Sequence, residues 1–352
     1  MLYNILQRAR KMGASDIHIS VNSYPMVRVD GELLLLNGNK LTGAVEGSED
    51  NMLVAEATLY YGFKLDKLAL QGIVEQLIGK KLLWTLEKCG EVDIAWEDNR
   101  LGRYRANIFK ENGSYAISMR LINKKIPSCK QLGIPDTVQN LMNVKNGLII
   151  VTGPTGCGKS TTLAALIEKI NHEKSAHIIT LEDPIEYKYS LGNGVINQRE
   201  IGTDTQTFAS GLRNALREDP DIILVGELRD AEAVKVALQA AETGHLVLST
   251  LHTKDAVATI NRLIDMLPEA KEQTRSQLAD CLVGIIAQEL VKRSDGKGRI
   301  AAMEILLNNN AVANLIREGR THQIYSYMQT GNKLGMQTMQ ASMDALKKQQ
   351  LI

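Results

Sequence analysis

One short motif constrains this chain more than any other feature. Residues 153–160 read Gly-Pro-Thr-Gly-Cys-Gly-Lys-Ser and fit the pattern G-x-x-x-x-G-K-[ST]. Glycines let successive backbone N–H groups approach phosphate oxygens, Lys159 reaches the β- and γ-phosphates, and the Ser160 hydroxyl ligates Mg²⁺. A strand pattern over 147–152 precedes the motif and a helical pattern over 160–170 follows it. The helix N-terminus adds its dipole to the anion site.

The motif therefore predicts a nucleotide site that uses Mg²⁺. The alternative is a glycine-rich turn that matches the pattern by chance, and the strand and helix beside it argue against that. The residues expected to line the site are Gly153, Pro154, Thr155, Gly156, Cys157, Gly158, Lys159, Ser160 and Thr161.

Strand and helix patterns alternate around this motif. Strands are expected over 147–152, 176–181, 222–225 and 246–250, with helical runs between them such as 160–170 and 231–242. That alternation is typical of βαβ units and a parallel sheet, so the fold class is α/β. From about residue 269 onward the pattern is mostly helical.

The N-terminal part has a different character. Residues 1–126 predict an α+β domain, and Pro127, Gly133 and Pro135 make 127–136 the expected linker to a core over 137–352. The residues 39–52 favour a surface loop. Helices are expected at the start of the chain and over 52–60 and 72–88, and strands over 16–20, 26–29, 32–36, 91–96, 103–109 and 115–120.

Charge and composition exclude several classes of protein. The 352 residues carry a formal net charge of +1, which disfavours a globally basic nucleic-acid binder. The four cysteines form no CxxC pair and suggest neither a zinc site nor a disulfide framework. No apolar run approaches the roughly 20 residues that span a bilayer, and the N-terminal stretch has basic residues too early for a secretory signal. The expected location is the cytoplasm.

Acidic residues follow two of the expected strands. Glu182 and Glu186 come at and after the end of 176–181, where a carboxylate can serve as the base near the γ-phosphate. Glu227 follows Gly226 at the end of 222–225, as in a Walker-B strand, and is expected to support Mg²⁺ or the attacking water. The alternatives are a solvated acidic turn for the first pair and a chance acid for Glu227.

Histidines and arginines complete the set of candidates. His245 and His252 bracket the strand over 246–250, so at least one of them is expected to sense the γ-phosphate, although a lone histidine is more often structural. An arginine can stabilise the transferred phosphoryl group, even from a neighbouring subunit, whereas a surface ion pair is the simpler role for any single one. The arginines considered are Arg103, Arg105, Arg120, Arg213, Arg217 and Arg229.

These motifs, taken in order, resemble the secretion ATPase superfamily, which powers type II secretion, type IV pili and archaeal flagella. Its Walker A, Asp box, Walker B and His box correspond to 153–160, 180–186, 221–227 and 243–253. Residues 13–19 (GASDIHI) and 26–31 resemble the PAS-like N-terminal domain of that family. Residues 311–318 (AVANLIRE) are similar to the AIRNLIRE motif of the PilT-like retraction ATPases, and the four-cysteine insertion of extension and secretion relatives is missing.

The resemblance implies a PAS-like domain followed by a RecA-like ATPase core with a helical C-terminal part. It implies ATP and Mg²⁺ as cofactors, with Lys159 and Ser160 on phosphate and metal. Glu186 would act as general base, Glu227 would support metal and water, and His252 or His245 would contact the γ-phosphate. Arg105 and Arg120 match basic positions that face a neighbour's nucleotide in the family.

The resemblance also implies partners: a homohexameric ring, with ATP between the two domains of a subunit, acting on an inner-membrane pilus platform protein at the inner face of the cytoplasmic membrane. No nucleic acid is expected. The alternatives are an extension or type II secretion ATPase of the same fold, a nucleotide-sensing ring subunit that does no mechanical work, and a DNA or RNA translocase. The chain departs from the family pattern at 41–70, at Val312-Ala313 within AVANLIRE, and at Met303 before Glu304.

Overall fold

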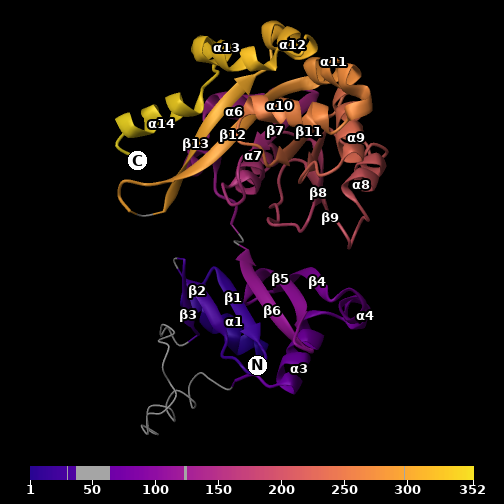
Figure 1. Cartoon of the computed structure of the whole chain (residues 1–352), viewed down its shortest axis with the longest axis vertical. Coiled ribbons are helices and arrows are strands. Elements are labelled where there is room, and N and C mark those ends of the chain that lie inside the picture. Colours follow the sequence, from indigo (N-terminus) through magenta and orange to yellow (C-terminus); the bar gives the residue numbers. More distant parts are fainter. Residues whose placement is uncertain (30, 37–63, 123–124, 297) are drawn as a thin grey trace. The chain divides into compact units, whose positions relative to one another are not determined.

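The computed structural model describes residues 1–29, 31–36, 64–122, 125–296 and 298–352. The described residues form two compact units, Met1–Lys124 and Lys125–Ile352 (Figure 1). The helix predicted over 52–60 and most of the unusual 41–70 segment lie outside the described residues. Within the described part, no helix is long and apolar enough to cross a bilayer.

The first unit contains an antiparallel sheet with the strand order β3-β2-β1-β6-β5-β4. Its strands are β1 (Asp16–Ser20), β2 (Met26–Val29), β3 (Glu32–Leu35), β4 (Glu91–Asp98), β5 (Gly102–Glu111) and β6 (Ser114–Ile122). Its helices are α1 (Leu2–Lys11), α3 (Lys67–Leu77) and α4 (Lys80–Cys89). These helices pack on the sheet because each has an apolar stripe; in α1 the stripe consists of Leu2, Ile5, Leu6 and Ala9.

Side-chain alternation gives this sheet two different faces. In β5, Tyr104, Ala106 and Ile108 are buried in the core against the helices. Their neighbours Arg105 and Asn107 point to the other face, because successive side chains of a strand alternate. The first unit therefore has one apolar face and one polar face.

The second unit contains a mixed sheet with the strand order β13-β12-β7-β11-β10-β8-β9, parallel throughout except at β13 (Figure 1). Its strands are β7 (Gly147–Thr152), β8 (His177–Glu182), β9 (Val195–Glu200), β10 (Ile222–Val225), β11 (Leu246–Leu251), β12 (Leu282–Lys292) and β13 (Arg299–Leu307). Every residue of β7, β10 and β11 is buried, as expected for parallel strands that are covered on both faces.

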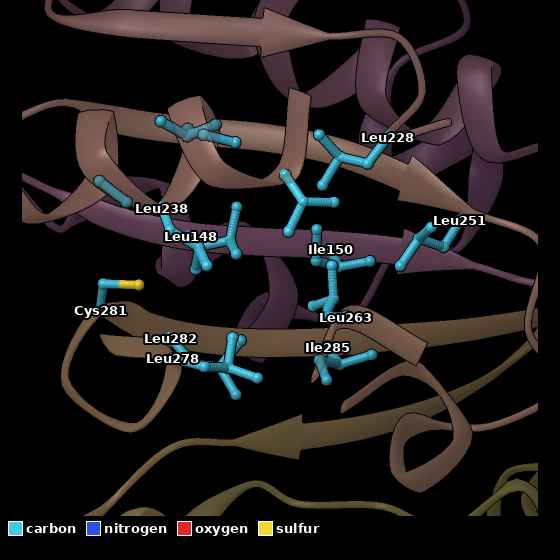
Figure 2. Packing of buried hydrophobic residues seen from close by; sticks show 14 of the residues in the cluster. Leu148, Ile150, Leu228, Leu238, Leu251, Leu263, Leu278, Cys281, Leu282 and Ile285 are labelled. Atoms are coloured by element: carbon cyan, nitrogen blue, oxygen red, sulfur yellow. The ribbon is translucent and has the colours of Figure 1, made fainter. Parts of the chain in front are cut away.

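Helices cover both faces of this sheet and fill the C-terminal part. They are α5 (Cys129–Leu132), α6 (Asp136–Asn140), α7 (Lys159–Glu173), α8 (Phe208–Ala215), α9 (Ala231–Glu242), α10 (Ala256–Asp265), α11 (Lys271–Cys281), α12 (Asn310–Arg317), α13 (Ile324–Thr330) and α14 (Met339–Lys348). Ile149 and Val151 of β7 pack with Leu166 of α7 on one face. On the other face, Figure 2 shows side chains of β7, α9, α10, α11 and β12 meeting in one cluster.

The region after residue 269 differs from the sequence-based expectation of mostly helix. Two long strands, β12 and β13, lie within it and form a hairpin at the edge of the sheet. Short apolar runs do not distinguish a buried strand from a buried helix, so pairing of β12 with β7 decides the outcome. The consequence for function is that β12 lies beside the strand that leads into the phosphate loop.

Candidate functional site

Parallel pairing brings the candidate motifs to one edge of the sheet. β7, β8, β10 and β11 run in the same direction, so the residues that follow Thr152, Leu181, Val225 and Leu251 all emerge at the carboxyl edge. Open α/β sheets bind ligands at this edge. The phosphate loop, the Asp box, Glu227 and His252 therefore share one region of the second unit.

The loop over 153–158 has a backbone that glycine favours. Gly153, Gly156 and Gly158 have φ angles of +142°, +77° and +91°, a region that side chains with a Cβ rarely adopt. Gly158 is also the N-cap of α7, and the first turn of that helix has no acidic residue. The backbone N–H groups of this turn and the helix dipole together favour an anion.

Lys159 is buried at this loop, with 8% of its surface exposed. Its Nζ atom donates to the carbonyl oxygens of Gly153 at 2.8 Å and Pro154 at 3.1 Å. Burial lowers the pKa of Lys159, while the nearby charges of Glu227 and Glu186 act in the opposite direction. Glu186 of the Asp box and Glu227 of the Walker-B segment are therefore close enough to Lys159 to interact with its charge.

His252 connects the lysine to Glu227. Its Nδ1 atom lies 3.3 Å from Lys159 Nζ, and its Nε2 atom lies 3.4 Å from Glu227 Oε1. An ammonium group can only donate, so this contact is a hydrogen bond in the tautomer whose ring proton is on Nε2, facing the carboxylate. The site thus contains a chain of three polar side chains from three separate loops.

Arg229 extends this chain to the Asp box. Its Nε donates to Glu227 Oε2 at 2.9 Å, and its Nη1 donates to Asp183 Oδ2 at 2.9 Å. The hydrogen bond to Glu227 is the main cause that raises the pKa of Arg229. Arg229 is thus a candidate arginine that lies at the carboxyl edge of the sheet. Its guanidinium is held there by Glu227 and Asp183.

The two glutamates of the Asp box have different surroundings. Glu182 accepts hydrogen bonds from Thr180 Oγ1 at 2.6 Å and Gln198 Nε2 at 3.2 Å, and burial raises its pKa. Both bonds end on Oε1, which is thus engaged in holding the end of β8. Glu186 lies beyond the turn and is half-buried, and its charge acts on Lys159. Of the two acids considered from the sequence, Glu186 is the better placed to act on a ligand.

His245 lies at the wrong end of β11 for the predicted role. Its Nδ1 atom is 3.1 Å from the carbonyl oxygen of Ala240, and its own carbonyl accepts from Gly147 N–H at the start of β7. The phosphate loop follows the other end of β7, so a strand length of about 20 Å separates the two places. Of the two histidines of which at least one was expected to contact the γ-phosphate, His252 is therefore the one at the phosphate-loop edge, and His245 lies at the opposite edge.

Arg105 and Arg120 lie in the first unit, on the polar face of its sheet. They are directly opposite each other across β5 and β6, and Arg120 is also opposite Asp16 of β1. Arg120 Nε donates to Asp16 Oδ1 at 2.7 Å, and Arg105 lies 3.9 Å from Asp93. Burial acts to raise the pKa of Asp16, but hydrogen bonds from Ser15 and Arg120 outweigh it and lower the pKa. The side chain of Arg120 nonetheless stays 71% exposed.

The oxygen donors at the carboxyl edge fit Mg²⁺. Mg²⁺ prefers oxygen ligands and is usually held by one or two protein groups together with substrate phosphates. The exposed hydroxyl of Ser160 and the carboxylate of Glu227 are donors of that kind. Among the described residues, no group of three His, Cys, Asp or Glu side chains could hold a metal by itself.

Several polar contacts around the loop join residues that are far apart in the sequence. Gln288 of β12 bonds both to Cys157 in the loop and to Thr162 in α7, and the Thr161 hydroxyl lies 2.9 Å from the Tyr187 hydroxyl beyond the Asp box. A single signal pointed to Gln288: it is a polar amide directly after the apolar run Ile285-Ile286-Ala287. Thr161 was expected at the site from its place in the motif, whereas Tyr187 gave no signal, because its spacing from Thr161 matches no local pattern.

A phosphate loop after β7, a carboxylate after β10 and a histidine after β11, all on a parallel RecA-like sheet, define a P-loop ATPase. Comparison with known proteins then places the chain more closely. The model of the Type II/IV secretion system protein family matches residues 110–350. The chain belongs to this family, and it is an ATP hydrolase.

Relatives and solved structures agree on the position within the family. The type IV pilus retractation ATPase PilT of Pseudomonas aeruginosa is 40% identical over 349 residues, covering 99% of this chain and 94% of PilT. A twitching motility protein of Neisseria gonorrhoeae is 48% identical over 263 residues, covering 74% and 70%. The crystal structure of the pilus retraction motor PilT with bound ADP matches with a TM-score of 0.86 and 43% identity, covering 99% of this chain and 93% of that one. The similarity to PilT-like retraction ATPases that the sequence indicates is thereby confirmed.

Proposed function

We propose that this chain is the ATP-hydrolysing motor that powers type IV pilus retraction. The observation that carries the proposal is the match to PilT over 99% of this chain and 94% of PilT. A match to the ATPase core alone would be expected for any secretion ATPase. Here the N-terminal unit is covered as well, so the similarity to PilT extends beyond the ATPase core.

The phosphate loop binds the β- and γ-phosphates of ATP in this proposal. Its backbone N–H groups and Lys159 donate to phosphate oxygens, and Lys159 exchanges the carbonyl oxygens of Gly153 and Pro154 for them. Ser160 and Glu227 hold Mg²⁺, which neutralises charge on the phosphates when it is bound. The thiol of Cys157 takes no part in this chemistry, because burial raises its pKa and so favours the neutral form.

Glu186 is the proposed general base that takes a proton from the attacking water. Glu182 is an unsuitable base because its carboxylate already accepts from Thr180 and Gln198. His252 is the proposed γ-phosphate contact, since it already lies against Lys159 on one side and Glu227 on the other. Loss of the γ-phosphate on hydrolysis would therefore alter the contacts of His252, and through them the position of the Glu227 carboxylate.

The motor is proposed to work as a homohexamer at the cytoplasmic face of the inner membrane, through a pilus platform protein. Arg105 and Arg120 are the proposed trans arginines, supplied to the nucleotide of a neighbouring subunit. Two arginines directly opposite each other on adjacent strands repel and do not favour folding. Asp16 and Asp93 offset part of this repulsion, and the phosphates of a neighbouring nucleotide would offset more of it.

The test is a strain that lacks the gene for this chain, scored for twitching motility and for surface pili. Lost motility with an excess of pili is the expected result, because fibres would assemble without being withdrawn. Reintroducing the wild-type gene should restore both, and reintroducing Lys159→Ala should restore neither. A strain with few or no pili would contradict retraction and identify an extension motor that uses the same ATPase chemistry.

A further inference from the structure

Gln288 of β12 uses both ends of its amide on the phosphate loop region. The residue is 3% exposed. Its Nε2 atom donates to the carbonyl oxygen of Cys157 at 2.5 Å, and its Oε1 atom accepts from the Thr162 hydroxyl at 2.8 Å. Cys157 belongs to the loop and Thr162 to the first turn of α7. One buried side chain therefore spans the junction at which the loop becomes a helix.

The bond to Cys157 sets the direction of a phosphate-facing N–H group. In a trans peptide the C=O and the following N–H point in opposite directions. Because the Cys157 carbonyl points to Gln288, the N–H of Gly158 points away from β12. The amide of Gln288 thus orients the Cys157–Gly158 peptide so that its donor is turned out of the protein interior.

The bond to Thr162 holds the other side of the same junction. Thr162 is 2% exposed, and its backbone N–H donates to the carbonyl oxygen of Gly158 at 2.9 Å. The Thr162 hydroxyl donates to Gln288 Oε1. The loop peptide and the first helical turn are consequently held by the donor and acceptor ends of one planar group.

Glycines of the loop fit closely against this residue. A Cβ on Gly153 would lie 2.3 Å from the backbone oxygen of Gln288, and one on Gly158 would lie 3.0 Å from its Nε2 atom. The register explains the proximity, since Ala287 pairs with Thr152, the last residue of β7. The loop thus begins and ends against Gln288.

We propose that Gln288 is a positioning residue that holds the phosphate loop in its phosphate-binding conformation. The inference rests on nucleotide binding at this loop, as the proposed function requires, and not on pilus retraction. An amide is needed because the position must donate on one side and accept on the other. A glutamate of the same size would place a carboxylate oxygen against the Cys157 carbonyl, and a methionine would make neither bond.

The test compares purified Gln288→Met, Gln288→Glu and Thr162→Val with the wild type. Readouts are the Kd for Mg·ADP by calorimetry, KM and kcat for ATP, and the thermal midpoint without nucleotide. Each lost buried hydrogen bond weakens the state that contains it by a factor of roughly 2 to 10. Gln288→Met loses two such bonds, so we expect it to raise the Kd about 4- to 100-fold. Thr162→Val loses one bond and should raise the Kd less, and adding it to Gln288→Met should change little further.

Gln337→Met is the matched control, because Gln337 also donates to a backbone carbonyl, that of Met303 at 2.8 Å, in the same unit. It should lower the thermal midpoint without changing the Kd or KM. A folded Gln288→Met protein with wild-type Kd and KM would overturn the proposal. If Gln288→Met does not fold, an unchanged Kd in Thr162→Val would overturn it equally. Failure of the wild type itself to bind Mg·ADP would instead contradict the proposed function.

Discussion

The Nδ1 atom of His252 lies 3.3 Å from the Nζ atom of Lys159. The same imidazole faces Glu227 through Nε2 at 3.4 Å, and Glu227 is held in turn by Arg229 at 2.9 Å. Side chains from three loops are therefore connected at the edge where the phosphate loop opens. The connection predicts that changes at these residues will affect ATP turnover much more than folding.

Replacement of His252 with alanine should lower kcat about 100- to 1,000-fold, the usual effect of removing one donor aimed at developing charge. His252→Asn keeps an acceptor and a donor and should retain more activity. His245→Ala is the matched control, since His245 lies at the far end of the same strand. Steady-state ATPase assays on the three variants measure these effects. Equal losses of kcat in His252→Ala and His245→Ala would contradict the proposed role of His252 at the γ-phosphate.

Lys159→Ala and Glu227→Ala should leave the fold intact and abolish ATPase activity. Lys159 is the first residue of α7, directly after the phosphate loop, and Glu227 is the carboxylate that faces both His252 and Arg229. The two variants should differ in binding: Lys159→Ala should lose affinity for ATP, whereas Glu227→Ala should still bind it. Calorimetry and ATPase assays separate these effects. Measurable turnover by purified Glu227→Ala would remove the Walker-B assignment.

Arg229→Ala should lower kcat with little change in KM. Arg229 orients Glu227 and Asp183 through two hydrogen bonds of 2.9 Å, and the loss of such a supporting residue typically costs about 10- to 100-fold. Arg213→Ala is a suitable control, because Arg213 forms a surface ion pair with Glu232. If both variants keep wild-type kcat, the Arg229 contacts have no role in turnover.

Glu304 should make the stability of the second unit depend on pH. It is 3% exposed, its Oε1 accepts from Ala256 N–H at 2.9 Å, and burial raises its pKa above the ordinary value of 4.5. The folded state thus binds the proton more tightly than the unfolded state does. The contribution of Glu304 to stability is therefore fully present below pH 4.5 and is lost as the pH rises through the folded pKa.

Glu304→Gln removes this titration while keeping an acceptor for Ala256. Thermal midpoints measured between pH 4 and pH 8 should show a smaller decline for the variant than for the wild type. Glu272→Gln, on the exposed first turn of α11, serves as the control for a change in charge alone. Identical pH profiles for wild type and Glu304→Gln would show that the carboxyl group does not titrate differently on folding.

Mixed oligomers test the trans arginines. Arg120→Ala and Lys159→Ala should each be inactive alone, the first for lack of a supplied arginine and the second for lack of a competent phosphate loop. Co-assembled, they should regain part of the activity, because a Lys159→Ala subunit can supply Arg120 to a neighbour with an intact loop. Arg28→Ala, on the same polar face opposite Asp16, is the comparison variant. Absence of any recovery would argue that Arg120 acts within its own subunit.

Much of the local structure could be predicted from the sequence. The helix over 231–242 and the strand over 222–225 have the predicted bounds, and β4, β5 and β6 lie where the alternating runs indicate. These elements were predictable because their patterns are local. β12 and β13 were missed, since apolar runs of their length suit either a strand or a helix until a neighbouring strand pairs with them.

The same distinction between local patterns and long-range contacts applies to the candidate site. The sequence by itself determined the phosphate loop, the candidate acids Glu182, Glu186 and Glu227, and two candidate histidines, because motif chemistry depends on residue types at short spacing. Only the tertiary structure decided between His252 and His245, because both flank one strand and the direction of parallel pairing sets which end meets the loop. It also brought Gln288 to Cys157, a contact between residues 131 positions apart that no local spacing encodes.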